Sequence, residues 1–237
     1  MNNVTIGSSI ICMDHINLQR DVELANEIGI DYLHLDVMDG AAVPRYGIYP
    51  EIVQAISKLC NIPMDLHLMV DDIEMGIEQF SDIENIEYIS FHYSENKHNI
   101  LSIIDKIWEK KKKAGIVFNL SVSAQEIVEV LNLEKLDSIM FMGIHPGVLK
   151  QTSRPKNVIK KLEYINSKVD QSNIPEFIQV DGGVSFDSIP HLINAGANNL
   201  ICGSSTLYKD VDLVSEWGKN EILIKNNFKT IKSLVGY

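Results

Sequence analysis

The sequence predicts an α/β protein built as a single closed (β/α)8 barrel. Short apolar runs rich in β-branched residues alternate with longer amphipathic stretches along the whole chain. Such repetition implies parallel strands joined by right-handed helical crossovers. The length of 237 residues is close to the ~250 residues typical of such a barrel. No linker-like tract interrupts the pattern, so we expect one domain over residues 1–237. An open doubly wound sheet is the alternative.

The spacing of apolar residues places the individual elements. One helix is expected over Leu18–Ile28, and another over Ile127–Leu131 after Ser123, a candidate N-cap. Eight short runs have the length and composition of buried strands. They are Ile6–Cys12, Tyr32–Val37, Met64–Leu68, Ile89–His92, Gly115–Leu120, Ser138–Met142, Phe177–Val180 and Asn199–Cys202.

The overall charge and composition exclude several classes of partner. The chain carries 21 Lys and Arg against 32 Asp and Glu, a formal net charge of -11, so we expect neither nucleic acid nor an anionic membrane as a partner. No apolar run reaches the roughly 18 residues of a membrane span. The polar start Met1-Asn2-Asn3 lacks the pattern of a signal peptide. We therefore expect a cytoplasmic protein, with its three cysteines reduced.

Four chemically reactive residues fall at the predicted strand ends. His34 and Asp36 are two apart and point to the same face of one strand, His67 ends the third strand, and Asp181 follows the seventh. A lone residue of either kind is commonly structural, but four at one rim indicate a site. Two imidazoles and two carboxylates suit a divalent ion such as Zn2+, Mn2+, Fe2+ or Co2+, of which we expect Zn2+.

Two carboxylates at one barrel mouth also indicate a reaction. Asp36 and Asp181 could remove and return a proton on opposite faces of a carbon next to a carbonyl, which inverts its configuration. A metal ion would stabilise the enediolate that forms between these two steps.

Apolar and glycine-rich segments flank these residues. Met38, Met69 and Met142 fall at strand ends, where they could cover a planar intermediate or simply fill the core. Gly182-Gly183 follows the seventh strand and Gly203-Ser204-Ser205 follows the eighth, where such barrels bind phosphate.

A string of short motifs runs through the chain from Ser9 to about Tyr208. In chain order they are His34-Leu35-Asp36-Val37-Met38-Asp39-Gly40, Val43-Pro44, Asp65-Leu66-His67-Leu68-Met69, His92, Pro146-Gly147, Val180-Asp181-Gly182-Gly183-Val184, Ala195-Gly196-Ala197 and Gly203-Ser204. Together they resemble the ribulose-phosphate 3-epimerases.

The resemblance implies a ribulose-phosphate-binding barrel of the pentose phosphate pathway, an isomerase that interconverts D-ribulose 5-phosphate and D-xylulose 5-phosphate. It implies that His34, Asp36, His67 and Asp181 bind one divalent metal ion, and that Asp36 and Asp181 are also the catalytic acid and base. It also implies a homo-oligomer. The residues expected at the sugar phosphate are Ser9, Met38, Met69, His92, Met142, Gly147, Gly182, Gly183, Gly203 and Ser204.

The chain also departs from the family pattern. The loop after the sixth strand, His145–Gln151, has lost two glycines, so Lys150 or Arg154 could bind phosphate instead. The Asn that usually follows Val-Pro is Arg45, and Ser9–Asp14 looks like the first strand of allulose-6-phosphate 3-epimerases. Two alternatives thus stay open, namely epimerisation of another sugar phosphate such as D-allulose 6-phosphate, and an inactive barrel that binds a sugar phosphate.

Overall fold

In a computed structural model, which describes residues 4–93, 100–133, 135–212 and 216–236, the strands form a closed ring. Every strand pairs in parallel with its neighbour in sequence, and β1 also pairs with β8. This closure confirms the barrel and excludes the open sheet. The strands are β1 (Thr5–Ser9), β2 (Tyr32–Met38), β3 (Met64–Met69), β4 (Ile86–His92), β5 (Lys113–Phe118), β6 (Ser138–Met142), β7 (Phe177–Asp181) and β8 (Asn199–Cys202).

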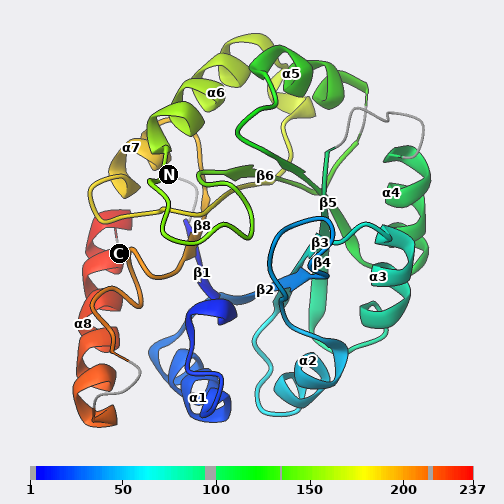
Figure 1. Ribbon diagram of the computed structural model, residues 1–237. Helices are drawn as coiled ribbons and strands as arrows, with labels where there is room; N and C mark the ends of the chain where they lie inside the picture. Colours follow the sequence, from blue (N-terminus) through cyan, green and yellow to red (C-terminus); the bar gives the residue numbers. More distant parts are fainter. Residues whose placement is uncertain (1–3, 94–99, 134, 213–215, 237) are drawn as a thin grey trace.

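The α-helices surround this ring (Figure 1). In the part of the chain that the structure describes, each crossover between consecutive strands contains one α-helix, as expected for right-handed parallel connections. The helices are α1 (Leu18–Ile28), α2 (Pro50–Ser57), α3 (Ile73–Phe80), α4 (Ile100–Glu109), α5 (Ala124–Leu133), α6 (Pro155–Lys168), α7 (Ile189–Asn194) and α8 (Trp217–Val235).

The sequence predicted the start of α5 from a cap. Ser123 and Glu126 form a reciprocal capping box, in which the Glu126 N–H donates to Ser123 Oγ at 3.2 Å and the Ser123 N–H donates to Glu126 Oε2 at 2.8 Å. The helix then extends beyond the predicted Ile127–Leu131 at both ends.

Three of the predicted strands were wrong by two or more residues at one end or both, and the other differences are of a single residue. β1 ends at Ser9, because Ile10–Cys12 turn into a short 3-10 helix, η1, at the rim of the barrel. β4 begins at Ile86, since the exposed Glu87 breaks the apolar run without breaking the strand. β5 covers Lys113–Phe118 and ends where the chain turns outward into the next helix.

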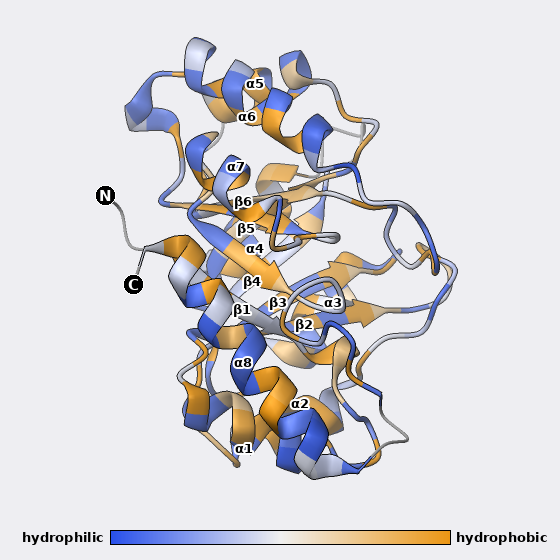
Figure 2. Cartoon of the chain, turned by 90° about the vertical axis from the view of Figure 1, so that its left-hand side faces the viewer, coloured by the Kyte–Doolittle hydropathy of each residue, from blue (hydrophilic) through white to orange (hydrophobic). Residues whose placement is uncertain are grey.

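The hydrophobic core has two layers. Figure 2 shows apolar strands at the centre and helices with one apolar and one polar side. Most buried apolar residues pack between strands and helices in one large cluster. A separate cluster fills the inside of the ring, formed by Tyr32, Val117, Met140, Met142 and Ile201.

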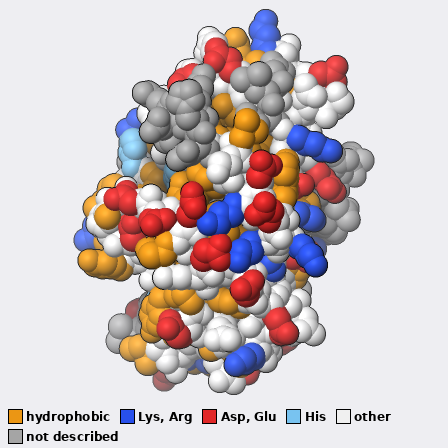
Figure 3. All heavy atoms as spheres, turned by 90° about the vertical axis from the view of Figure 1, so that its right-hand side faces the viewer, with side chains coloured by type: hydrophobic (Ala, Val, Ile, Leu, Met, Phe, Trp, Pro, Cys, Tyr) orange, Lys and Arg blue, Asp and Glu red, His pale blue; other side chains and the backbone are white. Residues whose placement is uncertain are grey.

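The outer surface over α3 and α4 carries mixed charge (Figure 3). Lys106 Nζ lies 3.1 Å from Glu74 Oε2, and Lys110 Nζ lies 2.7 Å from Glu78 Oε2. This face therefore presents paired charges rather than a field of one sign. None of the described helices is long and apolar enough to cross a membrane. All three cysteines are free, as predicted.

Candidate functional site

Strand register brings the four predicted ligand residues together. In the β2–β3 pair, Asp36 lies opposite His67 and His34 lies opposite Asp65. Side chains two apart on a strand share a face, so all four of these point into the barrel. Asp181, the last residue of β7, completes the group.

The polar atoms of this group converge on one point. One ligand atom from each of His34, Asp36, His67 and Asp181 can be chosen so that all four lie within 4.8 Å of one another. Asp36 Oδ1 is 3.4 Å from His34 Nε2 and 3.3 Å from His67 Nδ1. Asp181 Oδ2 is 3.9 Å and 3.7 Å from the same two nitrogens.

The histidines are oriented from behind by other side chains. His34 Nδ1 lies 3.0 Å from Asp65 Oδ2, which also accepts a hydrogen bond from Gln179 Nε2 at 2.8 Å. His67 Nε2 lies 2.8 Å from His92 Nε2. These contacts occupy the outer nitrogen of each ring, His34 Nδ1 and His67 Nε2. The inner nitrogens, His34 Nε2 and His67 Nδ1, therefore face the carboxylates of Asp36 and Asp181.

The inner nitrogens are buried but have no hydrogen-bond partner. Buried polar atoms without a partner are costly unless a ligand satisfies them. Two such imidazole nitrogens beside two carboxylates, with His34 held by the carboxylate of Asp65, have the chemistry and the outer support of a divalent metal site. The described residues thus fit a divalent metal ion.

The surroundings separate the two carboxyl groups electrostatically. Burial raises the pKa of Asp181 above its ordinary value. Burial acts on Asp36 in the same sense, but the neighbouring charges of His34 and His67 outweigh it and hold the pKa of Asp36 well below its usual range. The two carboxyl groups therefore differ in their surroundings although they lie close together.

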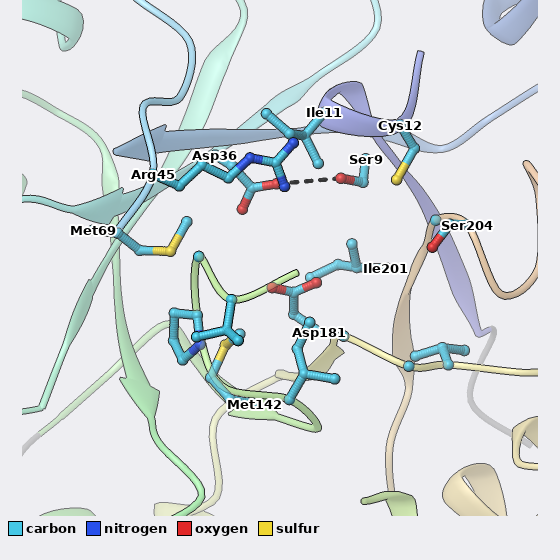
Figure 4. Close-up of a pocket in the computed structure, with 18 of the residues that line it drawn as sticks. Ser9, Ile11, Cys12, Asp36, Arg45, Met69, Met142, Asp181, Ile201 and Ser204 are labelled. Atoms are coloured by element: carbon cyan, nitrogen blue, oxygen red, sulfur yellow. Dashed lines mark hydrogen bonds between the residues drawn. The ribbon is translucent and has the colours of Figure 1, made fainter. Parts of the chain in front are cut away.

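Asp36 and Asp181 form the floor of a hollow of about 120 Å³ at the carboxyl ends of the strands, while His34 and His67 are fully buried and do not line it. Figure 4 shows Asp36 and Asp181 facing each other across it, with Ser9 Oγ donating to Asp36 Oδ2 at 3.2 Å. Nine of the ten residues predicted at the sugar phosphate line this hollow. They are Ser9, Met38, Met69, Met142, Gly147, Gly182, Gly183, Gly203 and Ser204.

His92, the tenth residue, does not line the hollow and instead lies behind His67. Burial and the neighbouring charge of His67 lower the pKa of His92 to about 3. A neutral His92 can accept a hydrogen bond from His67 Nε2, which would leave His67 Nδ1 unprotonated and available as a ligand.

The loops that form the wall of the hollow contact one another. Gly147 has φ +70, and a Cβ atom there would lie 2.9 Å from Val43 Cβ. Gly183 also has φ +70, and its Cβ would lie 2.0 Å from Ser153 Cβ. Only glycine fits these positions without a shift of the backbone, because both the conformation and the space exclude a side chain.

The chain is similar to known proteins over most of its length. Residues 5–207 match the model of the Ribulose-phosphate 3 epimerase family. The chain belongs to that family. A ribulose-phosphate 3-epimerase of Synechocystis sp. is 32% identical over 204 residues, which are 86% of this chain and 87% of that protein. The Escherichia coli K12 enzyme of the same name is 31% identical over 206 residues, 86% and 89% of the two chains.

Solved structures share the fold of this epimerase-family chain at low identity. A tryptophan synthase alpha-subunit from Pyrococcus furiosus superposes with a TM-score of 0.67 at 12% identity, covering 100% of this chain and 99% of that one. At this identity the likeness shows the barrel alone.

The sequence did not predict the positions of two residues at this site, Asp65 and Arg45. Asp65 supports His34, and the alternation of Asp65 with His67 along the strand could have indicated that it points inward. Arg45 lines the hollow, whereas the two cations considered from the sequence, Lys150 and Arg154, do not. A loop has no periodicity from which such a position could be read.

Proposed function

We propose that this protein is a metal-dependent epimerase that inverts the configuration at C3 of a ketose phosphate, interconverting D-ribulose 5-phosphate and D-xylulose 5-phosphate. The observation that carries the proposal is the pair Asp36 and Asp181, which face each other across one hollow beside two imidazole nitrogens without hydrogen-bond partners. Membership of the epimerase family supports the same reaction.

Four residues would hold the metal ion, namely His34, Asp36, His67 and Asp181. Two nitrogens and two carboxylate oxygens suit Zn2+ best in our proposal, and Fe2+, Mn2+ and Co2+ are also compatible. A bound divalent ion supplies a Lewis acid that polarises the carbonyl beside C3 and offsets the negative charge developing on the substrate oxygens.

The two carboxyl groups carry out the proton transfers. One carboxylate removes the proton from C3, and the other carboxyl group delivers a proton to the opposite face of the same carbon. One proton leaves C3 and one proton is delivered to it, so protons balance over one turnover. In the reverse reaction the two carboxyl groups exchange these roles. Ser9 orients Asp36 through its hydrogen bond, which holds the carboxylate toward the hollow.

The remaining lining residues bind the substrate and exclude water. Met38, Met69 and Met142 are buried around the two carboxyl groups and offer no exchangeable proton. Backbone N–H groups at Gly183, Gly203 and Ser204 are suited to a phosphate, because the chain can approach an anion closely there.

Isotope exchange tests this proposal directly. D-ribulose 5-phosphate incubated with the metal-loaded protein in D2O should acquire deuterium at C3, which nuclear magnetic resonance detects. Metal analysis of the same sample gives the identity and stoichiometry of the bound ion. A folded, metal-loaded protein that exchanges no deuterium at C3 would refute the mechanism and favour a barrel that only binds sugar phosphates.

The wall of the hollow favours a second candidate substrate for the same chemistry. Val148 and Leu149 stand exposed in the loop after β6, where the sequence predicted a remodelled phosphate loop. A six-carbon ketose such as D-allulose 6-phosphate is therefore the alternative substrate. The ratio of kcat/KM on five-carbon and six-carbon ketose phosphates decides between them.

A further inference from the structure

The wall of the hollow carries one positively charged side chain. Of the residues that the structure describes, Arg45 is the only lysine or arginine lining the hollow. Its side chain is half-buried, and none of the ion pairs among the described residues includes it. Figure 4 shows this side chain extending into the hollow on the side of Asp36 and Ile11. The guanidinium is thus available to a ligand.

The loop that carries Arg45 is fixed at both ends. Asp39 Oδ1 accepts hydrogen bonds from the N–H groups of Ala41 and Ala42 at 2.8 and 2.9 Å. Asp39 Oδ2 accepts a hydrogen bond at 2.8 Å from the N–H of Asp71, which lies two residues beyond the end of β3. On the other side of Arg45, the Gly47 N–H donates to the Met38 carbonyl at 3.0 Å and returns the loop to β2. This loop is therefore ordered before a ligand binds, which reduces the entropic cost of recognition.

A phosphate in the hollow needs a positive partner of its own. The divalent ion of the proposed function would offset the charges of Asp36 and Asp181 on the floor, so these two carboxylates do not prevent an anion from entering. The exposed side chains of Lys150 and Arg154 lie outside the lining, which leaves Arg45 as the described cation that can contact an anion inside the hollow. The loop of Arg45 also packs through Val43 against the turn at Gly147, so Arg45 belongs to the same wall as the loop after β6.

We infer that Arg45 binds the phosphate group of the substrate and is a specificity-determining residue of this site. A guanidinium offers two parallel N–H donors to a phosphate, in a geometry that a lysine cannot match. The inference rests on the proposed function for the identity of the substrate class. It adds a residue that recognises the phosphate by charge, beside the backbone N–H groups that recognise it by close approach.

Three variants that each remove one positive charge test the inference. Arg45→Gln removes the guanidinium in the hollow, while Lys150→Gln and Arg154→Gln are matched controls that change the net charge equally outside it. Binding of inorganic phosphate to the metal-loaded proteins is measured by titration calorimetry. Steady-state kinetics compare D-ribulose 5-phosphate with unphosphorylated D-ribulose, and thermal unfolding checks that each variant is folded.

Arg45→Gln should weaken phosphate binding and raise KM for D-ribulose 5-phosphate by about 10-fold to 100-fold, as expected for a lost charge-assisted hydrogen bond. Its activity on D-ribulose should stay within about twofold of the wild type, and both controls should match the wild type within about twofold. Arg45→Lys should fall between the wild type and Arg45→Gln.

Two results would overturn the inference. Equal losses on both substrates with unchanged phosphate binding would mean that Arg45 acts on the floor of the hollow instead. Wild-type phosphate affinity in Arg45→Gln would mean that the guanidinium does not contact the anion. Failure of the proposed function is distinguishable, because a wild-type protein without C3 exchange can still differ from Arg45→Gln in phosphate binding.

Discussion

The floor and the wall of the hollow are built in different ways. The floor and the two histidines behind it consist of strand residues whose positions follow from register, and these side chains are almost inaccessible, with 0% of His34, 9% of Asp36 and 14% of Asp181 exposed. The wall consists of η1 and the loops after β2, β6, β7 and β8. In the loop after β6, Val148 is 44% and Leu149 is 65% exposed. The barrel thus separates chemistry from recognition, because loops can change while the strands keep the reacting groups in place.

The largest effect is expected on the floor. Asp36→Asn and Asp181→Asn should each reduce turnover by roughly 10²-fold to 10⁴-fold, because each removes a proton-transfer group, and by more if metal binding also fails. Asp170→Asn is the matched control, since this carboxylate only caps the short helix η3 (Gln171–Asn173). Steady-state kinetics with metal analysis measure the loss. Wild-type turnover in either floor variant would remove that carboxyl group from the mechanism.

A smaller effect is expected one layer beneath the floor. Asp65→Asn keeps the shape of the side chain but removes the charge that orients His34. We expect metal affinity to fall by about 10-fold to 100-fold, the usual effect of losing such an outer partner. Competition with a chelator of known affinity measures it. Asp31→Asn, whose carboxylate accepts only from the backbone of Ile6 at 2.7 Å, should keep its affinity, and equal losses in both variants would indicate general destabilisation.

A change in the wall should act on substrate binding and stability rather than on proton transfer. Gly183→Ala places a Cβ against Ser153 at positive φ, so we expect a loss of about 1–3 kcal/mol in unfolding free energy and a raised KM. Gly218→Ala is the control, because its Cβ would meet open space in α8. Chemical denaturation and kinetics measure both quantities. A fall in kcat at unchanged KM would break the separation of floor and wall.

The smallest effect concerns Asp39, which holds the loop of Arg45. Burial acts to raise the pKa of Asp39, but the N–H groups of Asp71, Ala41 and Ala42 outweigh burial and lower it. A lowered pKa means that the stabilisation is complete above the ordinary pKa of about 4 and is lost as the pH falls through the lowered value.

Asp39→Asn should therefore reduce the unfolding free energy by about 1 kcal/mol at neutral pH. The difference from the wild type should shrink on acidification below pH ~4. Denaturation at a series of pH values measures this difference. A constant difference across the acid range would show that the charge of Asp39 does not hold the loop.

The difference between strand residues and loop residues also explains what could be predicted from the sequence. His34 and Asp36 were placed together because strand alternation is strict, and the register confirmed their encounter with His67. The end of β1 at Ser9 was missed, since Ile10 remains buried in η1 and its apolar character does not reveal the turn. Arg45 could be noted only as an unusual residue, because nothing local in a loop fixes which way a side chain points. The homo-oligomer remains a prediction.

The contact between Gly147 and Val43 links the wall loops after β2 and β6 into a single unit. If only the segment after β6 were replaced, for instance to restore the two missing glycines, the new segment would no longer fit against the loop after β2. Redesign of substrate preference in this barrel should therefore exchange residues 39–47 and 143–154 as one cassette. Chimeras that carry only half of it should fold, since the strands are untouched, yet recognise neither ligand well.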